Sequence, residues 1–342
     1  MDDLLTALTT RDRPLDRDDW RDFFNRLVSR RLRRGEAAAV LASLSTRMPD
    51  EHTLGALLDC LDERRPAPEL RFHDTVNIVG TGGGPRTFNV STAAAIVAAA
   101  IGVRVVKTGS RAYSSRYGSL DLLDRLGMRL TGSYQETAET LDRFGVAFTG
   151  NFVYPVEISL LVREILPLEL RAVGRFVNSV GPFLAAMPVG AQLTGMSDRA
   201  VLPTLRFLAG RLPDRRVWLC HNDLGADELL GIADNVIHHA NGDRLLPAGS
   251  HTDGGGTLAD LRPATGDPVE HFLAVLTGQA PQAAIDAVCL NAAALAVLSG
   301  HHDNWTVAVR AAAAALRNGS AIDLVNRMRS ARAANLLAVH RG

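Results

Sequence analysis

The spacing of apolar side chains changes near residue 70. Up to that point they recur at the three- and four-residue intervals of amphipathic helices, as in Trp20, Phe23, Phe24, Leu27 and Val28. Two more segments of this kind cover residues 37–44 and 54–61, and Pro66 and Pro68 close the region. We therefore expect a helical N-terminal region.

From His73 onward, short apolar runs typical of buried strands alternate with helical segments. Strands are expected at Thr75–Val79, Val103–Val106, Val146–Thr149 and Val217–Cys220. Helices are expected at residues 93–101, 120–126, 136–144, 269–276, 283–298, 305–316 and 322–336, with an irregular stretch that contains a hairpin or two at 240–268. Such alternation is typical of an α/β fold with a mainly parallel central sheet flanked by helices. The sequence thus predicts a small all-helical domain, residues 1–72, and a large α/β domain, residues 73–342.

Charge and cysteine usage narrow the class of protein. The chain has 37 Lys+Arg and 37 Asp+Glu, whereas nucleic-acid-binding domains usually carry a basic excess, so a nucleic-acid partner is disfavoured. Cys60, Cys220 and Cys289 are odd in number and lack metal-ligand spacing, which indicates reduced thiols. No unbroken apolar run of about 18 residues is present, so we expect no membrane span and a cytoplasmic location. The pairs His238-His239 and His301-His302 are expected at the surface.

A glycine-rich loop follows the first expected strand. Val79 is followed by Gly80-Thr81-Gly82-Gly83-Gly84, and Asn89, Ser91 and Thr92 then precede the helix at 93–101. Glycines let backbone N–H groups approach an anion closely, and a helix N-terminus adds unpaired donors. This arrangement predicts a phosphate site.

A second polar loop follows the next strand. It contains Lys107-Thr108-Gly109-Ser110-Arg111, and then Ser114, Ser115, Gly118 and Ser119 lead into the helix at 120–126. Because the carboxyl ends of parallel strands meet at one edge of a sheet, the two loops should converge on one ligand. Their composition predicts a ligand with more than one phosphate group.

Two carboxylates lie in a third segment of this kind. Asp227 and Glu228 follow the strand Val217–Cys220. Mg²⁺ prefers such hard oxygen ligands and often shares its shell with substrate phosphates. Taken alone, the pair also fits a helix N-terminus, where acidic side chains complement the dipole.

The string GTGG, FNVST, K-x-G-x-R and SS-x-x-GS-x-D closely resembles the core of the anthranilate phosphoribosyltransferase family. The resemblance extends over essentially the whole chain. It implies transfer of ribose 5-phosphate from phosphoribosyl pyrophosphate (PRPP) to an amine, with release of pyrophosphate and with Mg²⁺ present. It also implies that residues from about 156 to 180 fold back onto the helical domain, and that two copies form a homodimer through that domain.

The resemblance assigns roles to residues. The PRPP-binding residues would be Gly80, Thr81, Gly82, Gly83, Asn89, Ser91, Thr92, Lys107, Ser114, Ser115, Gly118 and Ser119. Lys107 and Arg111 would be catalytic, and Ser91, Asp227 and Glu228 would bind Mg²⁺.

The sequence departs from the family pattern once in the donor half and several times in the acceptor half. The family's Asp after GTGG, which helps to hold PRPP and metal, is Gly84, and the His and Asn that face its aromatic acceptor are Thr108 and Ser110. A further His is Tyr154, and the Arg that pairs with the anthranilate carboxylate falls at Leu168. Arg163 and Arg171 lie close to that position, so the acceptor-binding residues would be Thr108, Ser110, Tyr154, Arg163 and Arg171.

Three functions follow from this comparison. The leading hypothesis is a Mg²⁺-dependent phosphoribosyltransferase that uses a small aromatic or heterocyclic acceptor other than anthranilate. The second is a divergent anthranilate phosphoribosyltransferase of tryptophan biosynthesis. The third is a non-catalytic paralogue that acts as a binding module, and phosphorolysis of a nucleoside is a more distant alternative through the shared fold.

Overall fold

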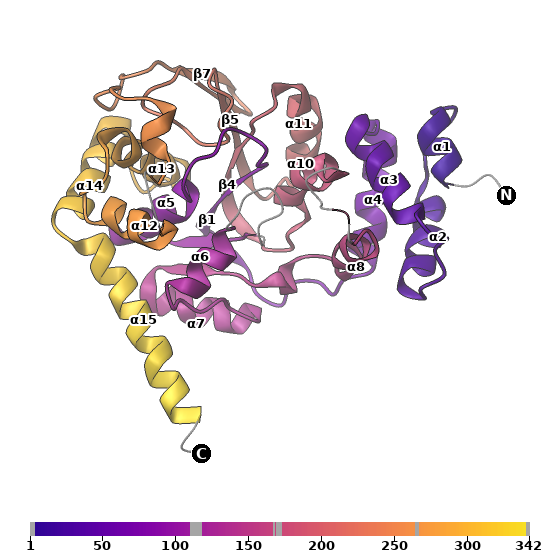
Figure 1. The fold of residues 1–342 in the computed structure, drawn as a ribbon, viewed down its shortest axis with the longest axis horizontal. Coiled ribbons are helices and arrows are strands. Elements are labelled where there is room, and N and C mark those ends of the chain that lie inside the picture. The colour runs from indigo at the N-terminus through magenta and orange to yellow at the C-terminus, as the bar shows by residue number, and fades with distance from the viewer. Residues whose placement is uncertain (1–3, 110–117, 167, 169–172, 264–266, 340–342) are drawn as a thin grey trace.

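A seven-stranded sheet forms the centre of the molecule in the computed structural model (Figure 1). The structure describes the chain apart from residues 1–3, 110–117, 167, 169–172, 264–266 and 340–342. The strands are β1 Phe72–Gly80, β2 Val105–Lys107, β3 Val146–Phe148, β4 Val189–Gly195, β5 Arg216–Asn222, β6 Asn235–His239 and β7 Gly242–Leu246. Their order is β3-β2-β1-β4-β5-β6-β7; β3 to β5 pair in parallel, and β6 and β7 complete the sheet in antiparallel fashion. The predicted α/β class with a mainly parallel sheet is confirmed.

Helices cover both faces of this sheet. The N-terminal helices are α1 Leu4–Thr10, α2 Arg17–Val28, α3 Glu36–Thr46 and α4 Glu51–Glu63. Those between the strands are α5 Val90–Ala100, α6 Ser119–Arg125, α7 Tyr134–Phe144, α8 Val156–Glu164, α10 Arg175–Leu184 and α11 Leu202–Gly210. The C-terminal ones are α12 Pro268–Leu276, α13 Gln282–Ser299, α14 Trp305–Arg317 and α15 Ser320–Val339, and the end of α15 projects from the body (Figure 1).

The largest core lies between one face of the sheet and the helices α5 and α13. Val76 and Ile78 of β1, with Ala191 and Leu193 of β4, point into it. Helix α13 is long and apolar enough to cross a membrane, but 78% of it is buried inside the protein, so it serves as the central core helix.

A second core joins the N-terminal helices to the opposite face. Asp16 and Asp50 cap α2 and α4 through their side chains, and Trp20, Phe23 and Phe24 are fully buried beneath them. This core continues without a break into α8, α10, α11 and Leu219 of β5. Buried side chains on both sides of residue 72 thus belong to one cluster. The domain boundary at this residue is our proposal from the sequence pattern.

Two expectations about histidine and cysteine are settled by burial. Cys60, Cys220 and Cys289 are free, as predicted, and all three are buried. The prediction that His238 lies at the surface is wrong: it is buried on β6, and its Nδ1 lies 2.7 Å from Oδ1 of Asp243. Asp243 lies on β7, which pairs with β6 in antiparallel fashion and belongs to the stretch where we expected irregular structure with a hairpin or two.

Candidate active site

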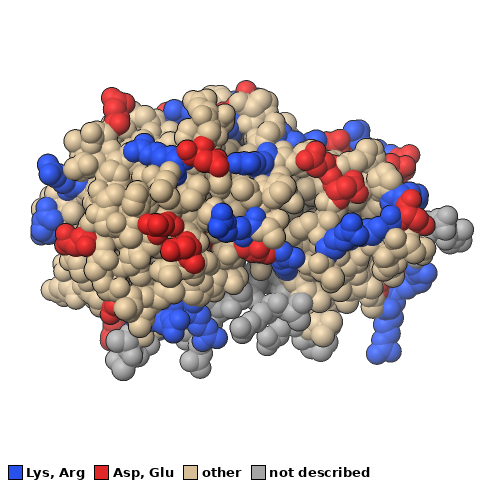
Figure 2. All heavy atoms as spheres, turned by 90° about the horizontal axis from the view of Figure 1, so that it is seen from above, with Lys and Arg blue, Asp and Glu red and all other residues tan. Residues whose placement is uncertain are grey.

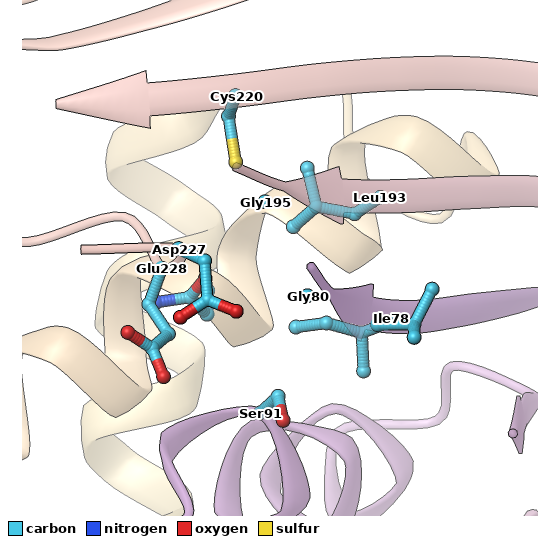
Figure 3. Close-up of a pocket in the computed structure, with 10 residues that line it drawn as sticks. Ile78, Gly80, Ser91, Leu193, Gly195, Cys220, Asp227 and Glu228 are labelled. Carbon is cyan, nitrogen blue, oxygen red and sulfur yellow. The ribbon is translucent and has the colours of Figure 1, made fainter. Parts of the chain in front are cut away.

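A small pocket opens where β1, β4 and β5 end and α5 begins (Figure 3). It is lined by Ile78, Val79, Gly80, Ser91, Leu193, Gly195, Cys220, Asp227, Glu228 and Asn291. Figure 3 shows the carboxylates of Asp227 and Glu228 on one side and the Ser91 hydroxyl, at the start of α5, on another. Four residues predicted from separate parts of the sequence, Gly80, Ser91, Asp227 and Glu228, thus meet at the sheet edge where α/β proteins bind ligands.

Backbone packing explains the glycines around Asp227. A Cβ atom on Gly80 would lie 2.0 Å from Oδ2 of Asp227, and one on Gly195 would lie 1.7 Å from the Asp227 carbonyl oxygen. The N–H group of Gly82 donates a 2.7 Å hydrogen bond to Asp227 Oδ2. Gly82 and Gly83 both have positive φ, which glycine adopts without strain. The glycine-rich loop is therefore shaped around a carboxylate from the segment that follows β5.

Ser197 holds the other side of this loop and was missed by the sequence analysis. Its hydroxyl donates to the Gly82 carbonyl oxygen at 2.5 Å, and its N–H group donates to Thr81 Oγ1 at 3.4 Å. A Cβ atom on Gly84 would lie 2.5 Å from the carbonyl oxygen of Gly225. A side chain at this position, where the family has aspartate, would therefore require the loop or the Gly225 segment to shift.

Lys107 is the only lysine in the chain, and its side chain is 4% exposed. Its Nζ donates a 2.9 Å hydrogen bond to the Ile78 carbonyl oxygen. Burial lowers the pKa of Lys107 to about 8, although the nearby carboxylates of Asp227 and Glu228 act in the opposite direction. The amine therefore lies within the electrostatic field of the carboxylate pair.

The carboxylate pair has more negative charge than the protein balances. Burial raises the pKa of Asp227, and burial together with Asp227 raises the pKa of Glu228 well above its ordinary value. Glu228 Oε1 accepts a bond from Thr87 at 3.3 Å, but its buried Oε2 has no partner among the described residues. An orphaned carboxylate oxygen beside a second carboxylate suits a cation with oxygen ligands, so these residues fit Mg²⁺.

Two buried asparagines fix the segment that carries the pair. The Asn222 amide donates to the carbonyl oxygens of Ala226 and Glu228 and accepts from the N–H groups of Leu224 and Ala226. Asn291, on the core helix α13, both donates to and accepts from the backbone of Leu229. Neither was predicted to belong to the site. Asn291 carried a signal in the sequence, as a lone amide inside an otherwise apolar segment, whereas Asn222 lies between His221 and Asp223 and carried none.

The remaining predicted residues near α5 and α6 lie in different environments. Asn89 precedes α5, and its carbonyl oxygen accepts from the N–H groups of Thr92 and Ala93. Thr92 is fully buried, and its hydroxyl has no partner among the described residues. Gly118 and Ser119 begin α6, with the Ser119 hydroxyl close to Gly109 and therefore to the loop after β2.

The three predicted acceptor residues that the structure describes, Thr108, Tyr154 and Arg163, are not among the residues that line the pocket. The side chain of Thr108 is buried, and its hydroxyl accepts a bond from Asn77 at 2.9 Å. Tyr154 packs between two apolar clusters beside α8, and Arg163 is exposed on α8. The predicted residues outside the described parts of the chain are Ser110, Arg111, Ser114, Ser115 and Arg171.

Comparison with known proteins identifies the family. Residues 73–322 match the family described as "Glycosyl transferase family, a/b domain". The chain is 31% identical over 331 residues to the anthranilate phosphoribosyltransferase of Methylorubrum extorquens, an alignment that covers 92% of this chain and 94% of that protein. The chain belongs to the anthranilate phosphoribosyltransferase family. It is therefore a glycosyltransferase of the pentosyltransferase type.

Other members of the anthranilate phosphoribosyltransferase family agree in length and fold. The enzyme of Synechococcus elongatus is 30% identical over 295 residues, 83% of each chain. The crystal structure of the Thermus thermophilus enzyme superposes with a TM-score of 0.77 at 28% identity, covering 96% of this chain and 98% of that one. The Saccharomyces cerevisiae enzyme in complex with PRPP and Mg shares the fold, with a TM-score of 0.78 at 20% identity and coverage of 96% and 97%.

Proposed function

We propose that this protein transfers ribose 5-phosphate from PRPP to a small aromatic or heterocyclic acceptor other than anthranilate. The bond between C1 of the sugar and the pyrophosphate oxygen breaks, and the pyrophosphate leaves with the electron pair. A bond forms between C1 and the acceptor nitrogen, which loses its proton to solvent. The observation that carries the donor half is the convergence of the glycine-rich loop, Ser91, Lys107 and the pair Asp227-Glu228 at one sheet edge.

Each group of residues has a separate task in this proposal. The N–H groups of the glycine-rich loop and the Lys107 amine would stabilise charge on the departing pyrophosphate. Asp227, Glu228 and Ser91 would hold Mg²⁺, which supplies positive charge between the carboxylates and the donor phosphates. Because among the described residues no group of three His, Cys, Asp or Glu side chains is placed to hold a metal, substrate and water oxygens would complete its shell.

The altered acceptor rests on positions 108 and 168. The Thr108 side chain turns into the sheet, where its hydroxyl is bound by Asn77. Leu168, at the position of the family's carboxylate-binding arginine, is 50% exposed. An arginine–carboxylate pair is geometrically demanding, and an aliphatic side chain cannot replace it. An acceptor without a benzoate carboxylate therefore suits this chain better.

Titration calorimetry with PRPP, with and without Mg²⁺, tests the donor site first. We expect Mg²⁺-dependent binding in the micromolar range. Asp227→Ala should weaken it at least tenfold, whereas Asp223→Ala, which removes an exposed carboxylate from the same segment, should not. Absence of PRPP binding under both conditions would favour the non-catalytic binding module.

Pyrophosphate release then distinguishes the acceptors. We expect little release with anthranilate and PRPP, and more with at least one other aromatic or heterocyclic amine from a panel. Efficient turnover of anthranilate, with rescue of a tryptophan auxotroph, would establish the divergent anthranilate enzyme instead. For a nucleic-acid partner there is little support, because on the face in Figure 2 acidic and basic side chains are interspersed.

Two further proposals concern assembly and location. Large apolar side chains are exposed at Val156 of α8 (61%) and at Leu166 just beyond it (69%), which supports a homodimer through the helical region. Sedimentation of the wild type against a Val156→Glu, Leu166→Glu double variant checks this. The three free, buried cysteines support a reducing compartment such as the cytoplasm.

A further inference from the structure

Polar side chains line the face of the central strands that points away from the largest core. Asn77 of β1 pairs in register with Gln192 of β4. Both side chains, and that of Thr194 on β4, are buried on this face. Burying polar side chains costs free energy unless they are hydrogen-bonded, and here the bonds form one continuous chain. This chain of bonds begins at Arg215 and ends at Thr108, the first residue after β2.

The hydrogen bond from Arg215 fixes the orientation of the side-chain amides in this network. A guanidinium only donates, so Arg215 Nη1, at 2.9 Å, requires the carbonyl oxygen Oε1 of Gln192 to face it. The Gln192 Nε2 group then donates to Thr194 Oγ1 at 2.9 Å and to the Pro182 carbonyl oxygen at 3.2 Å.

The direction is also fixed from the Thr108 end. A backbone N–H group only donates, so Asn77 Oδ1 accepts from the N–H of Thr108 at 3.0 Å. The Asn77 Nδ2 group donates to Thr108 Oγ1 at 2.9 Å and to Gln192 Oε1 at 3.3 Å. Both ends demand the same orientation of the Asn77 amide, so the network is consistent throughout.

Asn77 and Ile78 form hydrogen bonds with Thr108 and Lys107, respectively. The Asn77 side chain binds Thr108 at two points, and the carbonyl oxygen of the next residue, Ile78, accepts the bond from Lys107 Nζ. We propose that Asn77 is a positioning residue for the transfer reaction: by clamping Thr108 it aims the Lys107 amine at the Asp227-Glu228 side of the pocket, and Gln192 and Arg215 fix the direction of the clamp. The inference rests on the proposed function for its catalytic meaning, but not for its geometry.

Because Lys107 is the only lysine, an amine-selective reagent reports directly on its position. We would measure labelling of Lys107 by mass spectrometry, together with the Kd for PRPP in the presence of Mg²⁺ and the melting temperature. The variants are Asn77→Ala, Thr108→Val, which keeps the shape and removes the hydroxyl, and Thr108→Ser, which keeps the hydroxyl. Thr75→Val is the matched control, since Thr75 is 1% exposed on the same strand and its hydroxyl bonds to Phe72.

We expect Asn77→Ala and Thr108→Val to raise Lys107 labelling several-fold and to weaken PRPP binding by about tenfold, a factor that corresponds to one lost hydrogen bond. Thr108→Ser should keep Lys107 labelling and PRPP affinity near their wild-type values, and Thr75→Val should lower only the melting temperature.

If labelling and PRPP affinity stay at wild-type values in Asn77→Ala while stability falls as in Thr75→Val, Asn77 is merely structural and the proposal is wrong. Thr108→Val keeps the test decisive if Asn77→Ala does not fold. A wild type that binds no PRPP would overturn the proposed function, while the labelling result would still decide the clamp.

Discussion

At the scale of single residues, the site is defined by three ionisable groups that share a poorly hydrated space. Lys107 is buried against Ile78, and two carboxylates lie close enough to influence its pKa. Burial of both carboxylates, and the effect of Asp227 on Glu228, raise the pKa of each and oppose full ionisation of the pair, although the Lys107 amine acts in the opposite direction. A bound cation would therefore relieve the repulsion within the pair and would also offset the negative charge of a phosphorylated ligand.

The titration of Lys107 should be directly measurable. Labelling of this single lysine, followed against pH in the absence of ligand, should have its midpoint near 8 rather than at the ordinary value of about 10.4, because burial favours the neutral amine. PRPP with Mg²⁺ should suppress labelling at every pH. A midpoint above 10 would mean that the amine is hydrated and does not lie against Ile78.

Glu228 gives a prediction with a defined sign. Its pKa is raised in the folded protein, so the stability that it contributes is present below the unfolded value of about 4.3 and is lost as pH rises through the raised value. In a chelator at pH 7, Glu228→Gln should therefore raise the melting temperature, by about 1–2 °C for each kcal/mol of burial and repulsion cost removed from this chain. The gain should disappear near pH 4.

Glu36 provides the opposite control in the same experiment. Although burial acts to raise it, the pKa of Glu36 is lowered by bonds from the Arg33 backbone and the Arg26 side chain. Glu36→Gln should therefore lower the melting temperature at pH 7. Changes of the same sign in both variants would contradict the charge imbalance at Glu228.

At the scale of elements, the glycine-rich loop and the segment after β5 are shaped against each other. Gly82 donates to Asp227, Ser197 bonds to both Thr81 and Gly82, and Gly84 lies against the Gly225 backbone. An acidic side chain at position 84 therefore cannot be restored without moving one of the two segments.

Substitution of Gly84 tests this contact. Gly84→Ala places a Cβ 2.5 Å from a backbone oxygen and should cost about 1–3 kcal/mol of stability, together with PRPP affinity. Gly210→Ala, at the end of α11 where the added atom meets nothing within 4 Å, should be neutral or slightly stabilising. Denaturant unfolding of both variants decides, and equal stabilities would show that the loop moves freely away from Gly225.

At this scale, the sequence predicted those elements whose pattern lies within one contiguous run of residues. The strands β1, β2, β3 and β5, the glycine-rich loop and the pair Asp227-Glu228 are contiguous patterns, and each was found. Strand β4 was missed because Gln192, Thr194 and two glycines interrupt its apolar residues. Gln192 and Thr194 belong to the buried chain of hydrogen bonds, so the residues that form this network interrupt the apolar pattern of the strand.

Ser197 and Asn77 were missed for a related reason. Ser197 meets Gly82 across 115 residues of chain, and Asn77 meets Thr108 across 31. A single polar residue carries no signal of such a partner until the strand order is known. Residue types within one loop can be predicted from sequence, whereas the contacts that orient the loop require the fold.

At the scale of the whole molecule, the N-terminal helices depend on the rest of the chain for their core. Leu161 of α8, Phe176 and Val180 of α10, and Leu205 of α11 belong to the same buried cluster as Trp20 and its neighbours. Hydrogen bonds cross at the same place: the Ser45 hydroxyl accepts from the Phe176 N–H group at 3.2 Å, and Arg65 donates to the Leu184 carbonyl oxygen at 2.8 Å. Sequence continuity alone suggests a boundary at residue 72, but burial does not stop there.

The last prediction concerns this dependence. Residues 1–72 produced alone should show no cooperative thermal transition by circular dichroism, because a chain of this size that lacks part of its core has little stability to spare. The same segment joined through a flexible linker to residues 156–184 should regain helicity, since α8 and α10 complete much of the cluster. The full chain should unfold in a single transition. If residues 1–72 alone unfold cooperatively near the melting temperature of the full chain, the helical region is an independent domain that merely docks on the sheet, and motion between the two becomes the expected way for a substrate to enter.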